Sequence, residues 1–299
     1  MKTFWILLLL ICPIFLQAQE TATSEKTEKA AILMVHFGTT YDDTRNKTID
    51  AINQKVAHEF PDIKLVEAYT SRIVIKRLKA RGIDKPTPQE ALLKLAAEGY
   101  SRVFIQSTHI IDGIEADALR DEVEQMVPFF QDIRVGRPLL YSVEDCEQVS
   151  SILAARHAGT IGKNHSIVMV GHGTQTPANA IYSQMDYIFT VQGYPQIHVA
   201  TVEGFPSLDH ILSKLKTEKA KQVTLIPFMF VAGDHARNDM NGEWREKLEA
   251  EGFQVFTTLE GLGEIPGIQD LYVDHIRQGM KERPLKAREI KKAFLNETH

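Results

Sequence analysis

Apolar runs and amphipathic segments alternate along most of the chain. Residues 30–37 are almost wholly apolar, which is typical of a strand buried on both faces of a parallel sheet. Similar runs predict further strands at 63–69, 102–106, 166–170, 197–202, 223–228 and 254–259. Segments with one charged face predict helices between them, at 41–60, 87–98, 114–130, 178–190, 208–216 and 235–251. This alternation indicates βαβ units and parallel sheets.

The two halves of this pattern resemble each other. Residues 35–39 match 170–174 at the end of a first strand, and 103–113 match 223–233 around a third strand. The segment Glu67–Ser71 is also matched to Glu203–Ser207 at the end of a second strand. We therefore expect an α/β protein with two similar Rossmann-like domains, residues 30–150 and 151–299, each a parallel sheet flanked by helices.

The N-terminus has the layout of a secretory signal peptide. Lys2 precedes an apolar stretch that ends near Leu16, and Ala18 offers a small residue at a cleavage point. The stretch is too short for a stable membrane anchor. We expect a signal peptide at residues 1–18, a polar linker at 19–29, and an exported, periplasmic protein. An uncleaved anchor or a buried first helix remains the alternative.

Composition narrows the class of protein further. Of 299 residues, 43% are apolar and 24% are charged, which is typical of a globular protein. The net charge of -5 and the isoelectric point near 6.1 give no support for binding nucleic acid, which favours a basic surface.

Three residues of metal-ligating types follow three different strands of the second half. His172 follows the first strand, Glu203 ends the second, and His235 comes after the third. Ligands of open parallel sheets bind beyond the carboxyl ends of the strands, so these three side chains are expected at one edge. Two imidazoles and a carboxylate suit a divalent ion such as Co²⁺, Fe²⁺, Ni²⁺ or Zn²⁺.

Simpler interpretations of these histidines remain open. The chain holds 11 His, and a lone His in a loop is more often a cap or a solvated side chain than a ligand. The segment Gly171–Gly173 also resembles the Arg-His-Gly of histidine phosphatases, but the arginine that holds phosphate there is absent. The sequence contains no phosphate-binding loop of the G-x-x-x-x-G-K-[ST] type and no H-E-x-x-H zinc motif.

Several motifs together resemble the CbiK-type anaerobic cobalt chelatases. The strongest is Gly171–Thr174 followed by residues 177–182. Others lie at residues 34–40 with 43–45, 106–113, 201–207 and 230–240. The resemblance spans roughly residues 30–280. It implies the class II chelatase fold, two similar α/β domains with a cleft between them.

The resemblance also implies an activity and its residues. The family inserts Co²⁺ into sirohydrochlorin, a tetrapyrrole with eight carboxylates, on the oxygen-independent route to cobalamin. The family's metal-binding residues fall on His172, Glu203 and His235. Exported members exist in the family, and some are thought to serve iron or haem metabolism instead of cobalamin, so the metal and the tetrapyrrole used here stay open. Ligand type discriminates poorly between metals, so Fe²⁺ or Ni²⁺ remains an alternative to Co²⁺.

The reaction suggests further roles. Metal insertion displaces two N–H protons from the macrocycle, and an imidazole accepts protons well near neutral pH. We assign His172 as proton acceptor and metal ligand, with Glu203 and His235 as ligands. The substrate carboxylates call for cations, for which Arg45, Arg72 and Arg237 are candidates, and surface ion pairs are the alternative for each. His109 is expected to line the cleft from the opposite side.

Two other functions stay in play. The protein could be an exported tetrapyrrole or metal carrier without turnover, or a phosphatase-like hydrolase that uses His172 as nucleophile. The sequence does not determine the oligomeric state, so a homo-oligomer is possible. It does not determine the metal used in the cell either.

Overall fold

Two parallel four-stranded sheets form the frame of the molecule. The computed structural model describes residues 28–234 and 236–281. The first sheet has the order β2-β1-β3-β4 and the second the order β6-β5-β7-β8, so both follow the same plan. The strands are β1 (Lys29–His36), β2 (Lys64–Tyr69), β3 (Tyr100–Ser107), β4 (Asp132–Val135), β5 (His165–Gly171), β6 (Ile197–Thr201), β7 (Gln222–Pro227) and β8 (Gln254–Thr257).

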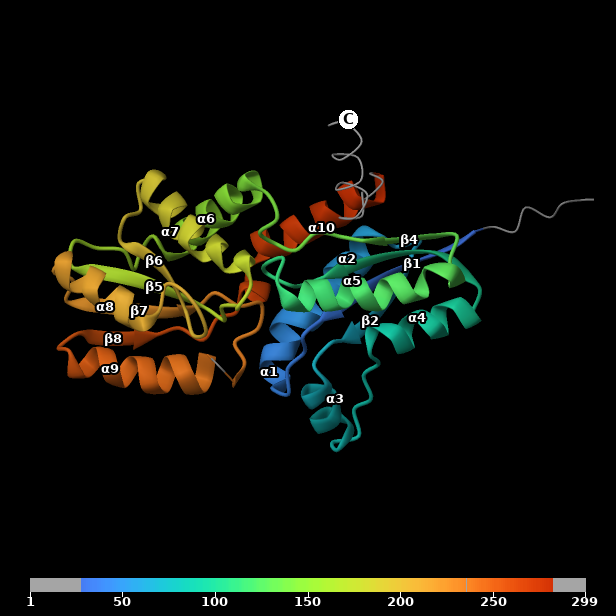
Figure 1. Cartoon of the computed structure of the whole chain (residues 1–299), viewed down its shortest axis with the longest axis horizontal. Helices are drawn as coiled ribbons and strands as arrows, with labels where there is room; N and C mark the ends of the chain where they lie inside the picture. Colours follow the sequence, from blue (N-terminus) through green and yellow to red (C-terminus); the bar gives the residue numbers. More distant parts are fainter. Residues whose placement is uncertain (1–27, 235, 282–299) are drawn as a thin grey trace, which may run out of the picture.

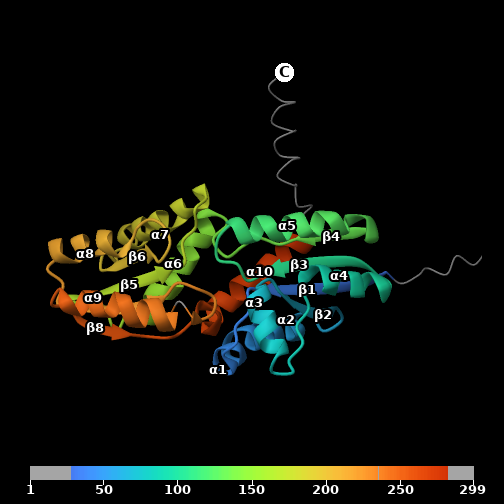
Figure 2. The same cartoon turned by 60° about the horizontal axis from the view of Figure 1, so that its bottom comes forward.

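Helices cover both faces of each sheet, and the two sheet-and-helix units lie side by side (Figures 1 and 2). In the first half they are α1 (Asp42–Arg45), the π-helix η1 (Asn46–Asp50), α2 (Ala51–Glu59), α3 (Arg72–Lys79), α4 (Pro88–Ala97), α5 (Ile114–Met126) and the short η2 (Val127–Phe129). In the second half they are α6 (Val143–His157), η3 (Pro177–Asn179), α7 (Ala180–Val191), α8 (Leu208–Thr217), the π-helix η4 (Ala236–Trp244), α9 (Arg245–Ala250), η5 (Leu262–Glu264) and α10 (Pro266–Lys281).

The α/β architecture predicted from the hydrophobic pattern is confirmed. Each strand that the pattern predicts is present, shifted by no more than two residues at either end. The predicted helix 41–60 is one continuous rod made of α1, η1 and α2. Five elements have no counterpart in the prediction, namely β4, α3, α6, η5 and α10.

Two of these unpredicted helices join the halves. α6 spans the predicted domain boundary at residues 150 and 151, and it packs on α7 of the second half. α10 comes last in the described chain but packs against β3, β4 and α2 of the first half (Figure 1). One buried apolar cluster accordingly includes Met34 of β1, Met169 of β5 and Tyr272 of α10. The two halves therefore share a core.

The second-strand match between the halves is wrong by four residues. The Ser71 amide donates to the Phe37 carbonyl, just as the Glu203 amide donates to the His172 carbonyl. Ser71 is therefore the structural counterpart of Glu203, and Phe37 is the counterpart of His172. Glu67 lies inside β2, where its carboxylate faces Asn53 of α2. The first half thus has no carboxylate where the second half has Glu203.

The structure also bears on the N-terminal prediction. Residues 1–18 and most of the linker at 19–29 lie outside the described residues, so the signal peptide stays a prediction. Within residues 28–234 and 236–281, no helix combines the length and apolar character needed to cross a membrane.

Candidate functional site

A cavity of about 580 Å³ opens between the two halves at the carboxyl ends of the strands. It is lined by structurally equivalent positions from both halves, such as Phe37 with His172 and Ser71 with Glu203. Its volume lies within the range of about 300–1,000 Å³ that is usual for small-molecule sites. The topology thus places the predicted site where parallel sheets bind ligands.

Two of the three predicted metal ligands line this cavity together. His172 directly follows β5, and its Nδ1 lies 3.1 Å from the Gly173 carbonyl oxygen. The Glu203 amide donates to the His172 carbonyl at 2.7 Å, so the two residues are adjacent across strands. His235 lies outside the described residues, but its neighbours Gly233 and Asp234 also line the cavity. Among the described residues, no group of three or more His, Cys, Asp or Glu is arranged to hold a metal ion.

The close approach of these two loops depends on Gly173. Its φ of +88° lies in the left-handed region, which a side chain disfavours. A Cβ at this position would also lie 2.0 Å from the Glu203 carbonyl oxygen. A hydrogen bond from the Thr174 amide to Asn179, and one from Asn179 to the Phe205 carbonyl, tie the same two loops further.

The first half contributes a second pair of polar groups from the opposite wall. Glu115, in the first turn of α5, is the counterpart of position 235 and lines the cavity. Its surroundings raise the pKa of its carboxyl through desolvation, and the charge of His172 opposes that rise. The sequence match of residues 103–113 to 223–233 places Glu115 where the second half has His235, but it assigns Glu115 no role.

His109 lies beside Glu115 and lines the cavity, as predicted from the sequence. Its side chain is buried, and its Nε2 lies 3.6 Å from a carboxylate oxygen of Glu115. Neither ring nitrogen has a hydrogen-bond partner in the described structure. Burial lowers the pKa of His109 to about 4, with smaller contributions from His36 and Arg120. His109 is therefore neutral at pH 7, with a lone pair available to a cation or donor in the cavity.

A third imidazole, His36, also lines the cavity but is fully engaged. Its Nδ1 lies 3.1 Å from the Thr108 hydroxyl and its Nε2 lies 3.1 Å from Asn53 Oδ1. Since Asn53 donates its amide to Glu67 at 2.8 Å, its oxygen must accept from His36. Burial lowers the pKa of His36 to about 4. Both ring nitrogens are used, so His36 offers no lone pair to a metal.

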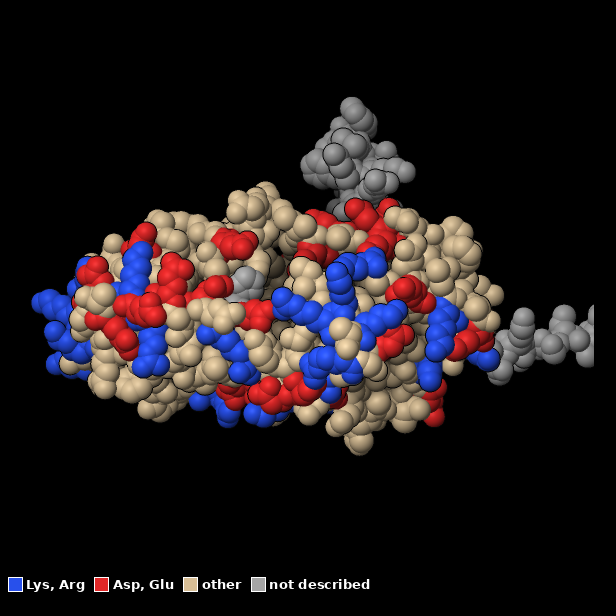
Figure 3. All heavy atoms as spheres, turned by 90° about the horizontal axis from the view of Figure 1, so that it is seen from below, with Lys and Arg blue, Asp and Glu red and all other residues tan. Residues whose placement is uncertain are grey.

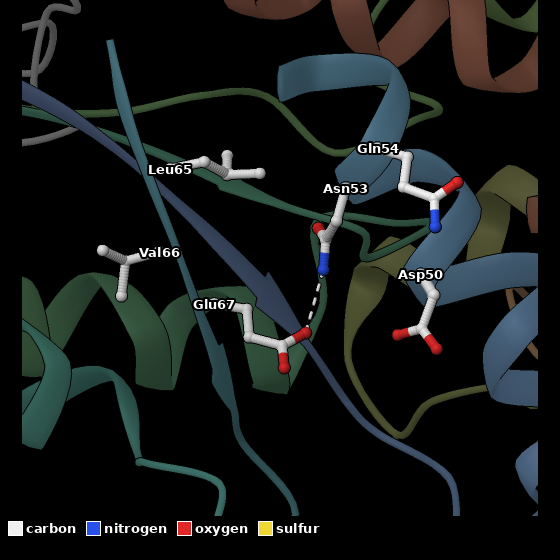
Figure 4. A pocket seen from close by; sticks show the side chains of 6 residues that line it. All are labelled: Asp50, Asn53, Gln54, Leu65, Val66 and Glu67. Carbon is white, nitrogen blue, oxygen red and sulfur yellow. Dashed lines mark hydrogen bonds between the residues drawn. The ribbon is translucent and has the colours of Figure 1, made fainter. Parts of the chain in front are cut away.

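The hydrogen bonds that run from His36 through Asn53 to Glu67 end at a second hollow. Figure 4 shows Asn53 and Glu67 pointing toward each other and joined by a hydrogen bond. Both line a hollow of about 340 Å³, together with Asp50, Gln54, Leu65 and Val66. Lys85 binds the other oxygen of Glu67. The hollow lies between α2 and the edge strand β2, away from the cavity that holds His172.

The predicted substrate-binding arginines are not among the residues that line the cavity. Arg45 pairs with Asp42 and Asp50 within its own helix, and Arg72 begins α3. Arg237 pairs with Asp43 across the halves. Of the described arginines, Arg77 of α3 is the one in the cavity lining. That these three contact the substrate stays a prediction, and Arg77 is a residue that the sequence did not single out.

A basic surface nevertheless adjoins the cleft. Figure 3 shows Lys and Arg gathered on the lower face, in the region of α3. Four of the eight residues of α3 are cations, namely Arg72, Lys76, Arg77 and Lys79. Inside the cavity the lining is more apolar, and Phe37, Ile73 and Ile114 leave about half or more of their surface exposed. Exposed apolar groups beside cations suit a flat ligand with an acidic periphery.

Comparison with solved structures supports the fold. The SirB protein from Bacillus subtilis with Fe³⁺ matches with a TM-score of 0.65 and 14% identity, over 84% of this chain and 95% of that one. SirB from Bacillus subtilis subspecies spizizenii in complex with cobalt matches with a TM-score of 0.62 and 13% identity, over 85% and 96% of the two chains. These likenesses show a shared class II chelatase fold.

Comparison of sequences identifies the family. A sirohydrochlorin cobaltochelatase of Salmonella typhimurium is 39% identical over 84% of this chain and 97% of its own length. The sirohydrochlorin cobaltochelatase CbiKC of Nitratidesulfovibrio vulgaris is 33% identical over 83% of this chain and 89% of its own. A model of the cobalt chelatase (CbiK) family matches residues 30–281. With its duplicated sheets, shared cleft and paired His172 and Glu203, the chain belongs to the CbiK cobalt chelatase family.

Proposed function

We propose that the protein is a sirohydrochlorin cobaltochelatase, which inserts Co²⁺ into the macrocycle with release of two protons. One observation carries the proposal. His172 and Glu203 from the second half and His109 and Glu115 from the first half line a single cavity. The 39% identity to a sirohydrochlorin cobaltochelatase supports the same activity.

The cavity provides for both substrates. The second half presents an imidazole and a carboxylate, which are ligands for a borderline divalent ion, and His235 is assigned as the third. Phe37, Ile73 and Ile114 provide apolar surface for the faces of the macrocycle. Arg77 at the wall provides a cation for a peripheral carboxylate.

Proton removal needs acceptors on both sides of the macrocycle centre. In our proposal, His172 accepts a proton when it is not bound to the metal at the same nitrogen. Glu115 faces His172 from the opposite wall, and its raised pKa makes it a better proton acceptor than an ordinary carboxylate. The two N–H protons thus leave to His172 and Glu115 as the two nitrogens bind the metal.

The test is metal insertion by the mature protein, residues 19–299, without oxygen. Sirohydrochlorin and Co²⁺ in excess over protein should give the metallated product over many turnovers, followed by visible absorption. His172→Ala should lower the rate by about 10² or more, the range for loss of an acid–base group. His58→Ala is the matched control, because the His58 side chain is 87% exposed.

The alternatives give different results in the same assay. A carrier would give at most one equivalent of spectral change per protein and no turnover. Retained turnover in His172→Ala would remove His172 from the mechanism. Competition between Co²⁺, Fe²⁺ and Ni²⁺ would assign the metal, which ligand type alone discriminates poorly.

We also propose that the protein is exported. The support is the charged start, the apolar stretch and the small residue at Ala18. Cell fractionation followed by N-terminal sequencing should find a periplasmic chain that begins near Gln19. A cytoplasmic chain that retains Met1 or its neighbours would contradict this part of the proposal.

A further inference from the structure

Asp234 is held by two residues of the opposite half. Its Oδ1 accepts a hydrogen bond from the Tyr41 hydroxyl at 2.8 Å, and its Oδ2 lies 3.3 Å from an amino group of Arg77. All three residues line the cavity. Tyr41 precedes α1 and Arg77 belongs to α3, so both partners come from the first half. The segment between β7 and η4 is thus tied to the other wall of the cleft.

Arg237, three residues later, is tied to the same place. Its guanidinium carbon lies 4.3 Å from the centre of the Tyr41 ring, within the range of a cation–π contact. One amino group lies 3.3 Å from Asp43 and 3.4 Å from the Thr44 hydroxyl. Tyr41 is therefore shared, with its hydroxyl on Asp234 and its ring under Arg237.

Positive and negative side chains alternate around this cluster, so each charge lies beside an opposite one. Arg77 and Arg237 are the cations, and Asp234 and Asp43 are the anions, with Tyr41 between them. A single exposed ion pair contributes little to stability, but a network with several partners holds its geometry better than one pair. The hydrogen bond to Asp234 raises the pKa of Tyr41, and desolvation is a second, smaller cause of the rise. We name Tyr41, Asp43, Thr44, Arg77, Asp234 and Arg237 the interdomain clamp.

We propose that the interdomain clamp sets the spacing of the two cleft walls during metal insertion, with Tyr41 as the positioning residue. The inference rests on the proposed function. Metal ligands on one wall must meet a macrocycle that rests partly on the other, and an error of about 1 Å in such an arrangement costs up to about 10² in rate. The clamp acts on both sides of position 235, since it holds Asp234 and Arg237.

The central experiment compares Tyr41→Phe with Tyr187→Phe. The Phe ring keeps a face for Arg237 but removes the hydroxyl that binds Asp234. Tyr187 lies on α7 with 69% of its surface exposed, so its replacement is the matched control. We expect Tyr41→Phe to lower kcat for cobalt insertion by roughly tenfold or more. The KM for sirohydrochlorin and the Tm should stay close to the wild-type values. An unchanged kcat would overturn the proposal. So would a fall in kcat that is explained by loss of folded protein, seen as a lower Tm.

A double-mutant cycle tests whether the residues act as one unit. Asp234→Ala removes the partner of both Tyr41 and Arg77. If the clamp works through Asp234, Tyr41→Phe should have little further effect on kcat in the Asp234→Ala background. Fully additive losses would show that Tyr41 acts independently of Asp234, contrary to the proposal.

A measurement without turnover separates failure of the clamp from failure of the proposed function. Ultraviolet titration of the tyrosines should show one fewer residue titrating late in Asp234→Ala than in the wild type. Identical titrations would mean that the bond is absent in solution, which overturns the clamp whatever the activity. If the wild type does not metallate sirohydrochlorin, the proposed function fails. The clamp is then tested by Co²⁺ affinity, which Tyr41→Phe should weaken. An unchanged Co²⁺ affinity in Tyr41→Phe would overturn the clamp.

Discussion

Three histidines at strand ends show how surroundings separate similar side chains. His172 and His109 face the cavity, whereas His36 directs both ring nitrogens into hydrogen bonds with Thr108 and Asn53. Burial keeps His36 and His109 neutral well below pH 7 by lowering each pKa to about 4. The same residue type therefore serves as a candidate ligand in one place and as a structural group in another.

The buried imidazole of His36 predicts a loss of stability in acid. The unfolded side chain titrates near 6.5 and the folded one near 4, so between these values the unfolded chain binds the extra proton. The free energy of unfolding should therefore fall as the pH falls from about 6.5 to about 4. His36→Asn should lower that slope by about one proton, or ~1.4 kcal/mol per pH unit. Urea titrations across the window provide the measurement.

The exposed His58 supplies the control for this prediction. His58→Asn, at a side chain that is 87% exposed, measures how far the loss of a surface histidine changes the slope. His109 is buried as well and keeps part of the slope in the His36 variant. An identical slope in His36→Asn and the wild type would show that His36 is not held neutral by the fold.

At the scale of elements, the loops after β5 and β6 are responsible for the site. The His172 and Glu203 loops touch through backbone atoms, so their spacing depends on a residue without a side chain at Gly173. Gly193 is a useful comparison, because its φ of +90° nearly equals the +88° of Gly173 while nothing lies within 4 Å of its missing Cβ.

These two glycines make a matched pair of alanine variants. Both substitutions place Ala in the left-handed region, at a cost of roughly 1–2 kcal/mol in stability. Gly173→Ala alone also forces its Cβ against the Glu203 carbonyl, so the Glu203 loop must move. We expect both variants to lose similar stability from strain and only Gly173→Ala to lose most of the cobalt affinity and turnover. Equal activity in the two variants would show that the loop contact has no bearing on the site.

How much the sequence reveals depends on burial at each element. The strands β1, β5 and β7 are buried along most of their length, and a continuous apolar run reveals them. β4 is only half-buried over four residues, so it leaves no such run. α3 does have a helical period, with Val74 and Leu78 buried four residues apart, but it is only eight residues long, at the lower limit of a typical helix.

The candidate site follows the same rule. Topology was enough to bring His172 and Glu203 to one cavity, because carboxyl ends of parallel strands share an edge. The match between the halves placed Glu115 where the second half has His235, but it could not show that Glu115 lies near His172, since the approach of α5 to the second half is decided by packing between the halves. The residue match of Glu67 to Glu203 fails for a related reason. Similar residue types in two segments do not determine which positions are structurally equivalent, whereas backbone hydrogen bonds do.

At the scale of the whole molecule, the two halves share one buried core. A single apolar cluster draws on β1, β5 and α10, and α10 returns from the second half to cover the first. The Tyr272 hydroxyl donates to the Thr108 carbonyl at 3.0 Å, and His275 Nε2 lies 3.0 Å from Asp145 at the start of α6. Neither half retains its full core without the other.

This shared core predicts one unfolding transition. Calorimetry of the mature protein should give a single peak whose van't Hoff and calorimetric enthalpies agree, since independent domains would unfold separately. Tyr272→Ala, which removes a fully buried ring, should lower stability by about 3–5 kcal/mol. Two resolved peaks in the wild type would contradict the shared core.

The central claim is that His172, Glu203 and His235 together hold the metal ion on one wall of the cleft. Calorimetric titration of Co²⁺ into the metal-free mature protein, without tetrapyrrole, tests it most directly. The account predicts one site per chain, weakened at least tenfold, or about 1.4 kcal/mol, by each of His172→Ala, Glu203→Gln and His235→Ala. His58→Ala should bind Co²⁺ as the wild type does. Wild-type affinity in any one of the three ligand variants would contradict the claim.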